Sequence, residues 1–406
     1  GGGGPEDSEA LRKENERLRE ELKRQQELIE AAKATMLGGA DDDSDSSTDD
    51  EPAAKRRGGG EENAEGLGAR VEKPMKKSER SYFDSYSKIG IHHEMLSDST
   101  RTGGYRDFLC NNPSLIRDKV VLDVGCGTGI LCMFAARAGA KMVIGIDMSD
   151  IIDDAREIVR ANGFEDKITL IKGKVEEVTL PVDRVDVIVS EWMGYFLLYE
   201  SMMDSVVYAR DKYLAPGGVC MPDKMVMKVA LLNDDQRLNF WDDVYGFDMK
   251  HIKNKVRARY LKDPMVEHYE PRQLVSKAVN FKEFDCQRLA VKDLEFSAPF
   301  KVWASQAGRC DALCTWFDTH FLSGCDSPVS FSTGPVTNMD EATHWKQTTF
   351  YLEGGLELKE GDVVEGVVHC HRAKNNPRHL DVVIEWAHVP TEGPRTPTKH
   401  QAFELH

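Results

Sequence analysis

The sequence lacks the features of a secreted or membrane-embedded protein. Its nine cysteines are scattered without a CxxC pair, and no secretory signal is present. No apolar run approaches the ~18 residues that a membrane-spanning helix requires. These absences predict reduced thiols, no membrane partner and a place in the cytoplasm, with the nucleus as a second location.

The sequence also lacks an excess of basic charge and a recognised metal-binding spacing. Asp and Glu number 69 against 53 Lys and Arg, giving a net charge of −16 and a pI near 5.3. An acidic surface repels nucleic-acid phosphates and attracts basic proteins, so we expect no direct nucleic-acid binding. His369 and His371 share one strand face, but no further ligand follows at a recognised spacing, and we predict no metal site.

Changes in composition divide the chain into five segments. They are a helical leader (1–37), an acidic disordered linker (38–78), an α/β domain (79–218), a domain of short strands (219–390) and a tail (391–406). Apolar residues recur at heptad positions of the leader, yet Asn15 and Gln25 interrupt the seam, so a short coiled coil and a solvated single helix both remain open. The linker has few large apolar residues, which predicts disorder.

Short apolar runs alternate with helical patterns in the α/β domain. The runs VVLDVG, MVIGID, ITLIKG and VDVIVSE read as strands, and helical patterns follow at 130–140, at 150–163 and around Glu200–Leu214. This alternation predicts a doubly wound parallel sheet. Short alternating strands after about residue 218 predict an antiparallel barrel or sandwich, and the segment at about 234–268 reads as helical.

A glycine-rich turn follows the first strand of this sheet. Gly125, Gly127 and Gly129 spell GxGxG, whereas the dinucleotide fingerprint GxGxxG would need glycine at the position of Ile130. The pattern therefore weakens the interpretation of a nicotinamide cofactor.

Two acids beside the turn favour another cofactor. Asp123 stands directly before the glycines, where it can pair with a ligand ammonium. Asp147 ends the second strand, where a carboxylate can bind both ribose hydroxyls of a nucleoside. A cofactor with positive charge and no phosphate suits an acid at each place, and S-adenosylmethionine fits this description.

The stretch SEWMGYFLLYES (190–201) places two carboxylates in an otherwise apolar segment. Burying a carboxylate is unfavourable unless a cation pairs with it, so Glu191 and Glu200 must either reach the surface or face a cation. A guanidinium is a planar cation that pairs bidentately with carboxylates, which makes a substrate arginine the predicted partner. Two acids would also localise its charge away from one nitrogen, leaving that nitrogen free to attack a methyl group.

Five motifs in order resemble those of the type I protein arginine methyltransferases: SYFDSYSKIGIHHEML (81–96), VLDVGCGTGI (121–130), the acid of IGID (144–147), SEWMGYFLLYES and THWKQT (343–348). The resemblance spans about residues 81–386, and the leader and linker look most similar to the arginine methyltransferase 3 subgroup. It implies an S-adenosylmethionine-binding Rossmann-like domain, then an antiparallel β-barrel with an inserted helical dimerisation arm at about 234–268. It also implies a homodimer that forms mono- and asymmetric dimethylarginine, with S-adenosylhomocysteine as product, on Arg/Gly-rich or basic proteins such as ribosomal proteins.

The resemblance assigns catalytic and substrate-binding roles to individual residues. Glu191 and Glu200 would clamp the substrate guanidinium. His344 would pair with Asp98, either to accept a proton or, as we favour, to hold the N-terminal segment over the site. The substrate-binding set that it implies is Glu191, Met193, Tyr195, Glu200, Met202 and Trp345.

The resemblance also implies a cofactor-binding set. In it, Arg101 would hold the cofactor carboxylate and Glu176 would reach the adenine amine. The resemblance implies that the N-terminal motif (81–96) forms a lid over the site. His93 departs from the family pattern, which usually has glutamate there, so the electrostatics of this lid differ at that position. The full set is Tyr82, Phe83, Tyr86, His92, Met95, Arg101, Asp123, Gly125, Gly127, Thr128, Gly129, Asp147, Met148, Lys174, Val175 and Glu176.

Two other functions fit parts of the sequence. A methyltransferase of a small guanidino compound would need the same two acids. A catalytically weak dimeric scaffold of the same fold would be favoured if Glu191 or Glu200 were replaced, and both are present.

Overall fold

The computed structural model describes residues 77–406, of which residues 81–406 form one compact unit. The predicted helical leader and almost all of the predicted linker lie outside the described residues. Four helices come first: α2 (Lys77–Tyr86), α3 (Ile89–Ser97), α4 (Ser99–Asn111) and α5 (Pro113–Ile116). Asp98 begins α4 as its N-cap, because its carboxylate accepts the backbone N–H of Arg101.

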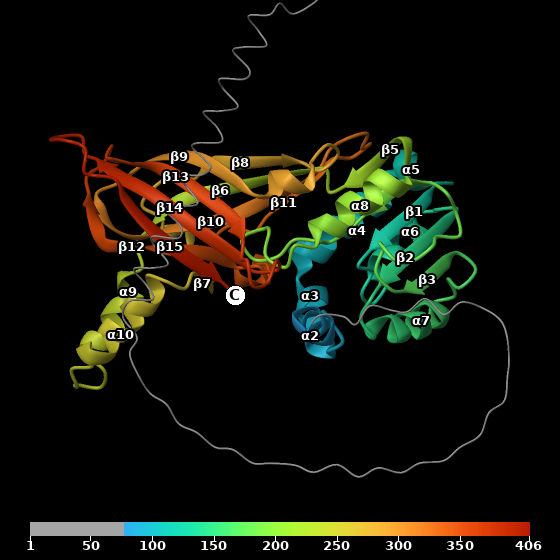
Figure 1. The fold of residues 1–406 in the computed structure, drawn as a ribbon, viewed down its shortest axis with the longest axis horizontal. Helices are drawn as coiled ribbons and strands as arrows, with labels where there is room; N and C mark the ends of the chain where they lie inside the picture. Colours follow the sequence, from blue (N-terminus) through green and yellow to red (C-terminus); the bar gives the residue numbers. More distant parts are fainter. Residues whose placement is uncertain (1–76) are drawn as a thin grey trace, which may run out of the picture. The chain divides into compact units, whose positions relative to one another are not determined.

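A five-stranded parallel sheet follows, as the sequence predicts. Its strands are β1 (Val120–Val124), β2 (Met142–Asp147), β3 (Ile168–Lys172), β4 (Val185–Val189) and β5 (Leu214–Met221), in the order β3-β2-β1-β4-β5. The helices α6 (Ile130–Arg137), α7 (Ile151–Ala161) and α8 (Met203–Tyr213) pack around this sheet, which is why its strands are apolar runs (Figure 1). The strand order switches direction between β1 and β4, and open α/β sheets bind ligands at the carboxyl ends of strands beside such a switch.

Two antiparallel sheets make up the second domain, in agreement with the predicted barrel. The larger sheet contains β6 (Lys224–Leu232), β7 (Met265–Glu267), β8 (Val279–Asp285), β10 (Gly308–Phe321), β11 (Val329–Ser332) and β12 (Gln347–Leu358). The smaller contains β9 (Phe296–Trp303), β13 (Val363–Arg372), β14 (Leu380–Val389) and β15 (Lys399–Leu405). Three short 3₁₀ helices connect strands: η2 (Pro271–Gln273), η3 (Val291–Leu294) and η4 (Met339–Glu341).

The end of the chain belongs to the barrel, whereas the sequence analysis treats 391–406 as a tail. β15 pairs antiparallel with β14 from Leu380↔Leu405 to Trp386↔Lys399. Phe403 and Leu405 alternate with polar residues along β15 and are buried, so a strand with one apolar face forms there.

The predicted helical arm is shorter than the segment assigned from the sequence. It consists of α9 (Asp235–Asn239), η1 (Phe240–Asp242) and α10 (Lys250–Tyr260), which project from the barrel strands (Figure 1). The last part of the 234–268 segment forms β7, which pairs with β12 and therefore belongs to the barrel sheet.

Helix α4 packs the parallel-sheet domain against the barrel. Tyr105 and Phe108 are fully buried, and their rings lie 5.0 and 4.7 Å from the ring of Phe321 on β10. Aromatic packing of this kind contributes beyond the area that it buries. Because α4 also carries Arg101, this packing fixes the position of a site residue relative to both domains.

Two further observations bear on the composition. All nine cysteines lie in the described part of the chain, and all are free thiols, as the scattered pattern predicts. No helix between residues 77 and 406 is long and apolar enough to cross a membrane.

Candidate active site

Two loops leave neighbouring strands at the switch point of the parallel sheet. The glycine turn follows β1, and the segment Ser190–Ser201, here called the acceptor loop, follows β4. Ser190 joins them, because its hydroxyl donates to the carbonyl of Val124 at 2.7 Å. The hydroxyl of Tyr105 on α4 donates to the carbonyl of Ser190 at 3.0 Å. The two loops therefore open on the same edge of the sheet.

The glycine turn has a backbone that only glycine adopts without strain. Gly125, Gly127 and Gly129 have φ values of 76°, 51° and 80°. A Cβ at Gly125 would overlap the methyl group of Met202, and one at Gly127 would lie 3.4 Å from Cε1 of His92. The N–H of Gly127 donates to Asp147 Oδ2 at 2.9 Å, which ties the turn to the end of β2.

Asp123 is a buried acid that lacks a full set of partners. Its Oδ2 accepts a weak hydrogen bond from the thiol of Cys132 at 3.2 Å, but Oδ1 has no partner among the described residues. Burial raises the pKa of Asp123 to about 7, and the thiol hydrogen bond acts in the opposite direction. A ligand ammonium would satisfy this oxygen and hold the carboxylate ionised. Asp123 thus fits the amino group of S-adenosylmethionine.

The remaining predicted cofactor residues surround this edge of the sheet. Asp147 is held by the N–H and hydroxyl of Ser149, at 2.8 and 2.6 Å from Oδ1. Val175 is buried, whereas the ammonium of Lys174 lies 3.7 Å from Glu177. Thr128 and Met148 are half-buried beside the glycine turn and the end of β2.

Glu176 has a partner that the sequence analysis does not anticipate. Its Oε1 accepts the hydroxyl of Ser205 on α8 at 2.6 Å, and its carbonyl accepts the hydroxyl of Tyr208 at 3.2 Å. Contact with an adenine amine stays a prediction for this residue.

The acceptor loop reverses sharply in order to return Glu200 to the site. Phe196, Leu197, Glu200 and Ser201 all have positive φ, between 50° and 76°, which is rare for residues with side chains. A Cβ at Gly194 would overlap the carbonyl of Tyr199, so glycine is required there. The helix that the sequence places around Glu200 begins only at Met203, because the loop continues through these strained residues.

Glu191 meets a cation from its own chain. The guanidinium of Arg101 donates to Glu191 Oε2 at 2.6 and 3.0 Å, and both side chains are 8% exposed. The sequence analysis assigns Arg101 to the cofactor carboxylate and leaves Glu191 to a substrate. Arg101 also pairs with Glu191, because a buried carboxylate needs a paired charge. Its contact with the cofactor carboxylate stays a prediction. Both bonds go to Oε2, which leaves Oε1 for a substrate guanidinium.

Glu200 is held by a neutral donor. The hydroxyl of Tyr86 on α2 donates to Glu200 Oε2 at 2.7 Å. Burial raises the pKa of Glu200 above its ordinary value; the Tyr86 hydrogen bond opposes this shift, and the negative charge of Glu191 adds to it. A raised pKa on one acid of the pair is what a buried pair of carboxylates requires.

The predicted lid residues lie on α2 and α3. The ring of Tyr82 lies 5.1 Å from that of Phe83 and 5.0 Å from that of Tyr86. His92 is buried, and its Nε2 lies 2.7 Å from the carbonyl of Tyr86, so this nitrogen carries the proton and donates. The carbonyl of Met95 accepts Nη1 of Arg101 at 3.2 Å, which ties α3 to the Arg101–Glu191 pair.

Asp98 and His344 form the predicted pair. Asp98 Oδ2 accepts both the ring Nδ1 of His344 at 2.8 Å and its backbone N–H at 2.9 Å, while Oδ1 accepts the N–H of Arg101 at 2.8 Å. Burial alone would raise the pKa of Asp98, but these hydrogen bonds lower it below the ordinary value. A carboxylate with three donors, serving also as a helix cap, is fixed in place, which favours the holding role.

Three predicted substrate residues lie in the acceptor loop or against it: Met193 and Tyr195 belong to the loop, and Trp345 contacts it. Trp345 is buried, and its indole N–H donates to the carbonyl of Met193 at 2.8 Å. The buried Met193 sulfur lies 3.6 Å from the hydroxyl of Tyr105. Tyr195 is half-buried, with its ring 6.2 Å from that of Tyr199. Trp345 therefore helps to position the loop, and its contact with a substrate stays a prediction.

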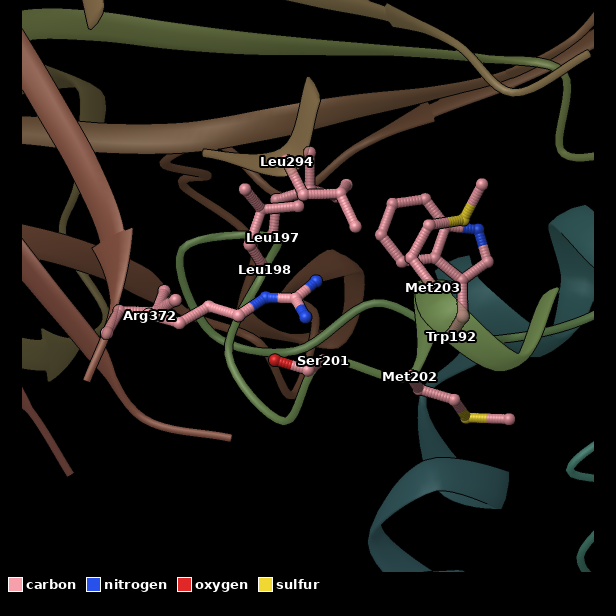
Figure 2. A pocket seen from close by; sticks show the side chains of 9 residues that line it. Trp192, Leu197, Leu198, Ser201, Met202, Met203, Leu294 and Arg372 are labelled. Atoms are coloured by element: carbon pink, nitrogen blue, oxygen red, sulfur yellow. The ribbon is translucent and has the colours of Figure 1, made fainter. Parts of the chain in front are cut away.

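A pocket lies between the acceptor loop, the start of α8 and the barrel. Its lining residues are Trp192, Leu197, Leu198, Ser201, Met202, Met203, Leu294, Arg372 and Leu380. Figure 2 shows the Met202 side chain pointing away from Leu197 and Leu198, consistent with its contact to the glycine turn. Arg372 forms a bidentate ion pair with Asp204 on α8, at 2.7 and 2.5 Å. No group of three or more histidine, cysteine or acidic residues within 77–406 could hold a metal ion.

The sheet order, the glycine turn with its two acids and the paired glutamates beside it define an S-adenosylmethionine-dependent methyltransferase of Rossmann-like fold. Family models match both the parallel-sheet domain and the barrel domain. Residues 116–263 match the family described as "Methyltransferase domain", and residues 223–391 match "Arginine methyltransferase oligomerization subdomain".

Individual relatives narrow the assignment. The chain is 49% identical over 320 residues to protein arginine N-methyltransferase 1 of Schizosaccharomyces pombe, covering 78% of this chain and 92% of the relative. It is 48% identical over 317 residues to the protein of the same name from Saccharomyces cerevisiae, covering 77% and 89%. Among solved structures, a chain of the "Trypanosoma brucei PRMT1 enzyme-prozyme heterotetrameric complex with AdoHcy" aligns with a TM-score of 0.72 at 41% identity, covering 80% of this chain and all of that one.

The chain therefore belongs to the protein arginine methyltransferase family, and S-adenosylmethionine is its cofactor. These relatives do not single out the arginine methyltransferase 3 subgroup to which the leader and linker point.

Some residues of the site carry no signal in the sequence. Tyr105 and Arg378 contact the acceptor loop, yet each sits in a segment without a recognisable motif or spacing. Arg378 comes from a barrel hairpin, and only folding brings it beside the lid.

Proposed function

We propose that this protein transfers methyl groups to arginine side chains of Arg/Gly-rich or otherwise basic proteins, forming mono- and then asymmetric dimethylarginine. The observation that carries the proposal is the placement of Glu191 and Glu200 on one strained loop directly beside the cofactor edge of the sheet. A single glutamate would be compatible with many structural roles. Arg101 occupies only Oε2 of Glu191, and the Glu200 carboxylate accepts the neutral hydroxyl of Tyr86, so a substrate guanidinium fits between the remaining oxygens of the pair.

The chain's own groups account for most of the chemistry. When bound, S-adenosylmethionine supplies a methyl group on a positively charged sulfur, which is readily attacked. Glu200 and the free oxygen of Glu191 hold the substrate guanidinium and draw its positive charge toward themselves, so one terminal nitrogen keeps electron density for the attack. Tyr86 fixes the direction of Glu200, and Arg101 fixes that of Glu191. Alignment of this kind supplies a large part of the rate in such transfers.

Asp98 and His344 hold the lid segment in our proposal. The proton on the attacking nitrogen becomes acidic as the new bond forms, so a strong base is unnecessary at the start of the reaction. The three hydrogen bonds at Asp98 instead link the start of α4 to the loop before β12.

We also propose a homodimer built through the arm. Large apolar side chains on the arm are exposed, among them Tyr245 at 98% and Phe247 at 67%. Exposed aromatic clusters of this kind mark protein interfaces, and the family description of residues 223–391 supports an oligomer. Sedimentation of the wild type and of a Phe247→Asp variant tests this, with a dimer expected for the first and a monomer for the second.

The choice of substrate rests on charge. The net charge of −16 suits basic, flexible partners, while no contact of the described residues favours ribosomal proteins over other basic proteins. A location in the cytoplasm, and also in the nucleus, stays a prediction, as does a place in the arginine methyltransferase 3 subgroup.

Incubation of the protein with an Arg/Gly-rich peptide and labelled S-adenosylmethionine, followed by amino-acid analysis, tests the function. Asymmetric dimethylarginine is expected. Symmetric product would overturn the product assignment, and no product in the peptide but turnover of free guanidino compounds would favour a small-molecule methyltransferase.

A further inference from the structure

One arginine of the barrel touches both the lid and the acceptor loop. Arg378 lies in the hairpin loop between β13 and β14. Its guanidinium carbon stands 3.6 Å from the ring centroid of Tyr82 and 5.5 Å from that of Phe83, both on α2. Its Nη1 donates to the carbonyl of Glu200 at 2.6 Å. A single side chain from the second domain therefore contacts the aromatic lid and one of the paired acids.

The hairpin backbone reinforces this contact. The N–H of Glu200 donates to the carbonyl of Arg378 at 2.7 Å, and the hydroxyl of Ser201 donates to the carbonyl of Pro377 at 2.5 Å. The ring of Tyr199 stacks at 5.8 Å on that of His379. Three consecutive residues of the acceptor loop are thus held by three consecutive residues of the hairpin.

The supported residues are the strained ones. Glu200 and Ser201 have φ values of 76° and 56°. For a residue with a side chain, a positive φ costs about 1–3 kcal/mol of conformational free energy, and it persists only if the surrounding structure holds it. Within the loop, the N–H of Ser201 donates to the carbonyl of Leu198 at 3.3 Å. The hairpin, in contrast, bonds both the N–H and the carbonyl of Glu200.

The chemistry of arginine suits the double contact. A guanidinium is planar, so it can stack its face on an aromatic ring while its edge donates hydrogen bonds. A lysine ammonium at the same place could keep the positive charge but could not make both contacts in a fixed geometry. The positive charge also lies close enough to the Glu200 carboxylate to favour its ionised form against burial.

We propose that Arg378 is a positioning residue for the transfer reaction, which fastens the lid helix α2 to the acceptor loop and thereby aims Glu200 at the substrate guanidinium. This inference rests on the proposed function and identifies a residue that acts through Glu200 and Tyr82 without touching the reacting atoms. It also gives the barrel a direct part in shaping the active site.

The proposal predicts a change in pH dependence as well as in rate. The groups that face Glu200 are Tyr82 and Tyr86 of α2, Glu191, Tyr195 and Tyr199 of the acceptor loop, and Arg378 of the hairpin. The hairpin supplies the cation of this set, and it lowers the pKa of Glu200. Its removal raises that pKa further, so a larger share of the enzyme holds a protonated Glu200 that cannot bind a cation. The acid limb of kcat/KM against pH then moves to higher pH.

Two variants separate charge from geometry. Arg378→Gln removes both, and we expect kcat/KM for an Arg/Gly-rich peptide to fall by about 10- to 100-fold, the size of one charge-assisted hydrogen bond and one cation–π contact, together with the shifted acid limb. Arg378→Lys keeps the charge, so the acid limb should stay in place while kcat falls. The dissociation constant for S-adenosylhomocysteine, measured by calorimetry, should rise in Arg378→Gln by a smaller factor than kcat/KM falls, because Tyr82 and Phe83 belong to the predicted cofactor-binding set.

Arg395→Gln is the matched control. Arg395 is an exposed barrel arginine that pairs with Glu365 at 3.1 Å, and its replacement should leave kcat/KM unchanged. A readout independent of activity is hydrogen exchange of residues 81–86, which should become faster in Arg378→Gln and not in Arg395→Gln.

The outcomes distinguish this inference from the proposed function. If the wild type has no transferase activity, the proposed function is wrong. The rate of hydrogen exchange in α2 would still support or overturn the fastening role of Arg378. An active wild type with an unchanged acid limb, unchanged kcat/KM and unchanged exchange in Arg378→Gln would overturn the role of Arg378. If Arg378→Gln does not fold, Arg378→Lys carries the test, and full activity in it would overturn the geometric part.

Discussion

The glycine turn and the acceptor loop lie side by side, yet they are held in different ways. The glycine turn is kept by close neighbours: Gly127 bonds to Asp147 twenty positions away, and its three glycines provide the backbone freedom. The acceptor loop depends on distant segments, because Glu191 pairs with Arg101 and Glu200 with Tyr86, 90 and 114 positions earlier in the chain.

This contrast suggests that cofactor binding and methyl transfer depend on different contacts. Cofactor binding should depend mainly on Asp123, the glycine turn and Asp147, so it should change less than turnover when the barrel is altered. Methyl transfer should depend on contacts between α2, α4, the acceptor loop and the barrel. Substitutions that change turnover without changing cofactor affinity, or the reverse, test this difference between the two loops.

The largest effect is expected from Glu200→Gln. Replacing the carboxylate by a neutral amide removes a charge aimed at the substrate cation, and turnover should fall by about 1,000-fold or more. The dissociation constant for S-adenosylhomocysteine should stay nearly the same, because Glu200 belongs to the acceptor loop. Glu392→Gln, an exposed residue paired with Lys359, serves as the control. Unchanged turnover in Glu200→Gln would refute the clamp.

Asp123→Asn should have the opposite effect to Glu200→Gln, because it should weaken cofactor affinity through the glycine turn. Loss of the charged partner for the cofactor ammonium should weaken cofactor binding by about 10- to 100-fold above neutral pH. In the wild type, affinity should fall about tenfold per pH unit below about 7, because a protonated Asp123 cannot pair with a cation. Calorimetry across this range checks both points, and a wild-type affinity independent of pH would contradict them.

The same substitution should change stability without ligand. The folded-state pKa of Asp123 lies above its ordinary value of 3.8, so the folded protein binds the proton more tightly between pH 3.8 and about 7. Stability from this group is therefore present at low pH and is lost as pH rises through about 7. Asp123→Asn should flatten that loss, and thermal unfolding of the ligand-free protein at pH 5 and pH 8 measures it.

His344→Gln should have a smaller effect if His344 holds the lid. Loss of one hydrogen bond to Asp98 should lower kcat by about tenfold and leave the shape of the pH profile unchanged. A general base would instead lose up to about 10⁴-fold, with an altered profile. His388→Gln, which removes a comparable pair with Asp362 on the barrel, should not affect turnover.

Trp345→Phe should have the smallest effect. The carbonyl of Met193 loses its indole donor, so the free energy of unfolding should fall by about 1–2 kcal/mol and kcat by a few-fold. Cofactor affinity should not change. A large rise in peptide KM with unchanged kcat would instead indicate direct contact between Trp345 and the substrate.

Much of the molecule could be predicted from the sequence, for a physical reason. Alternating apolar runs predict the parallel sheet, because buried strands must be apolar on both faces. Three glycines and an acid at each strand end predict the cofactor turn, because such a turn needs positive φ and a cation needs nearby carboxylates. The sequence also identifies the pair Glu191 and Glu200 and the contact between Asp98 and His344.

Other features depend on which distant segments meet, and no local pattern encodes that. The sequence shows that Glu191 requires a cation, but only the packing of α4 against the barrel shows that Arg101 supplies it. The sequence places a helix near Glu200, but the hairpin contacts of Arg378 and Pro377 hold that residue in a strained loop. Local sequence patterns therefore specify the chemical groups of the site. Tertiary contacts balance their charges, since a buried charge is stabilised by whatever lies beside it in space.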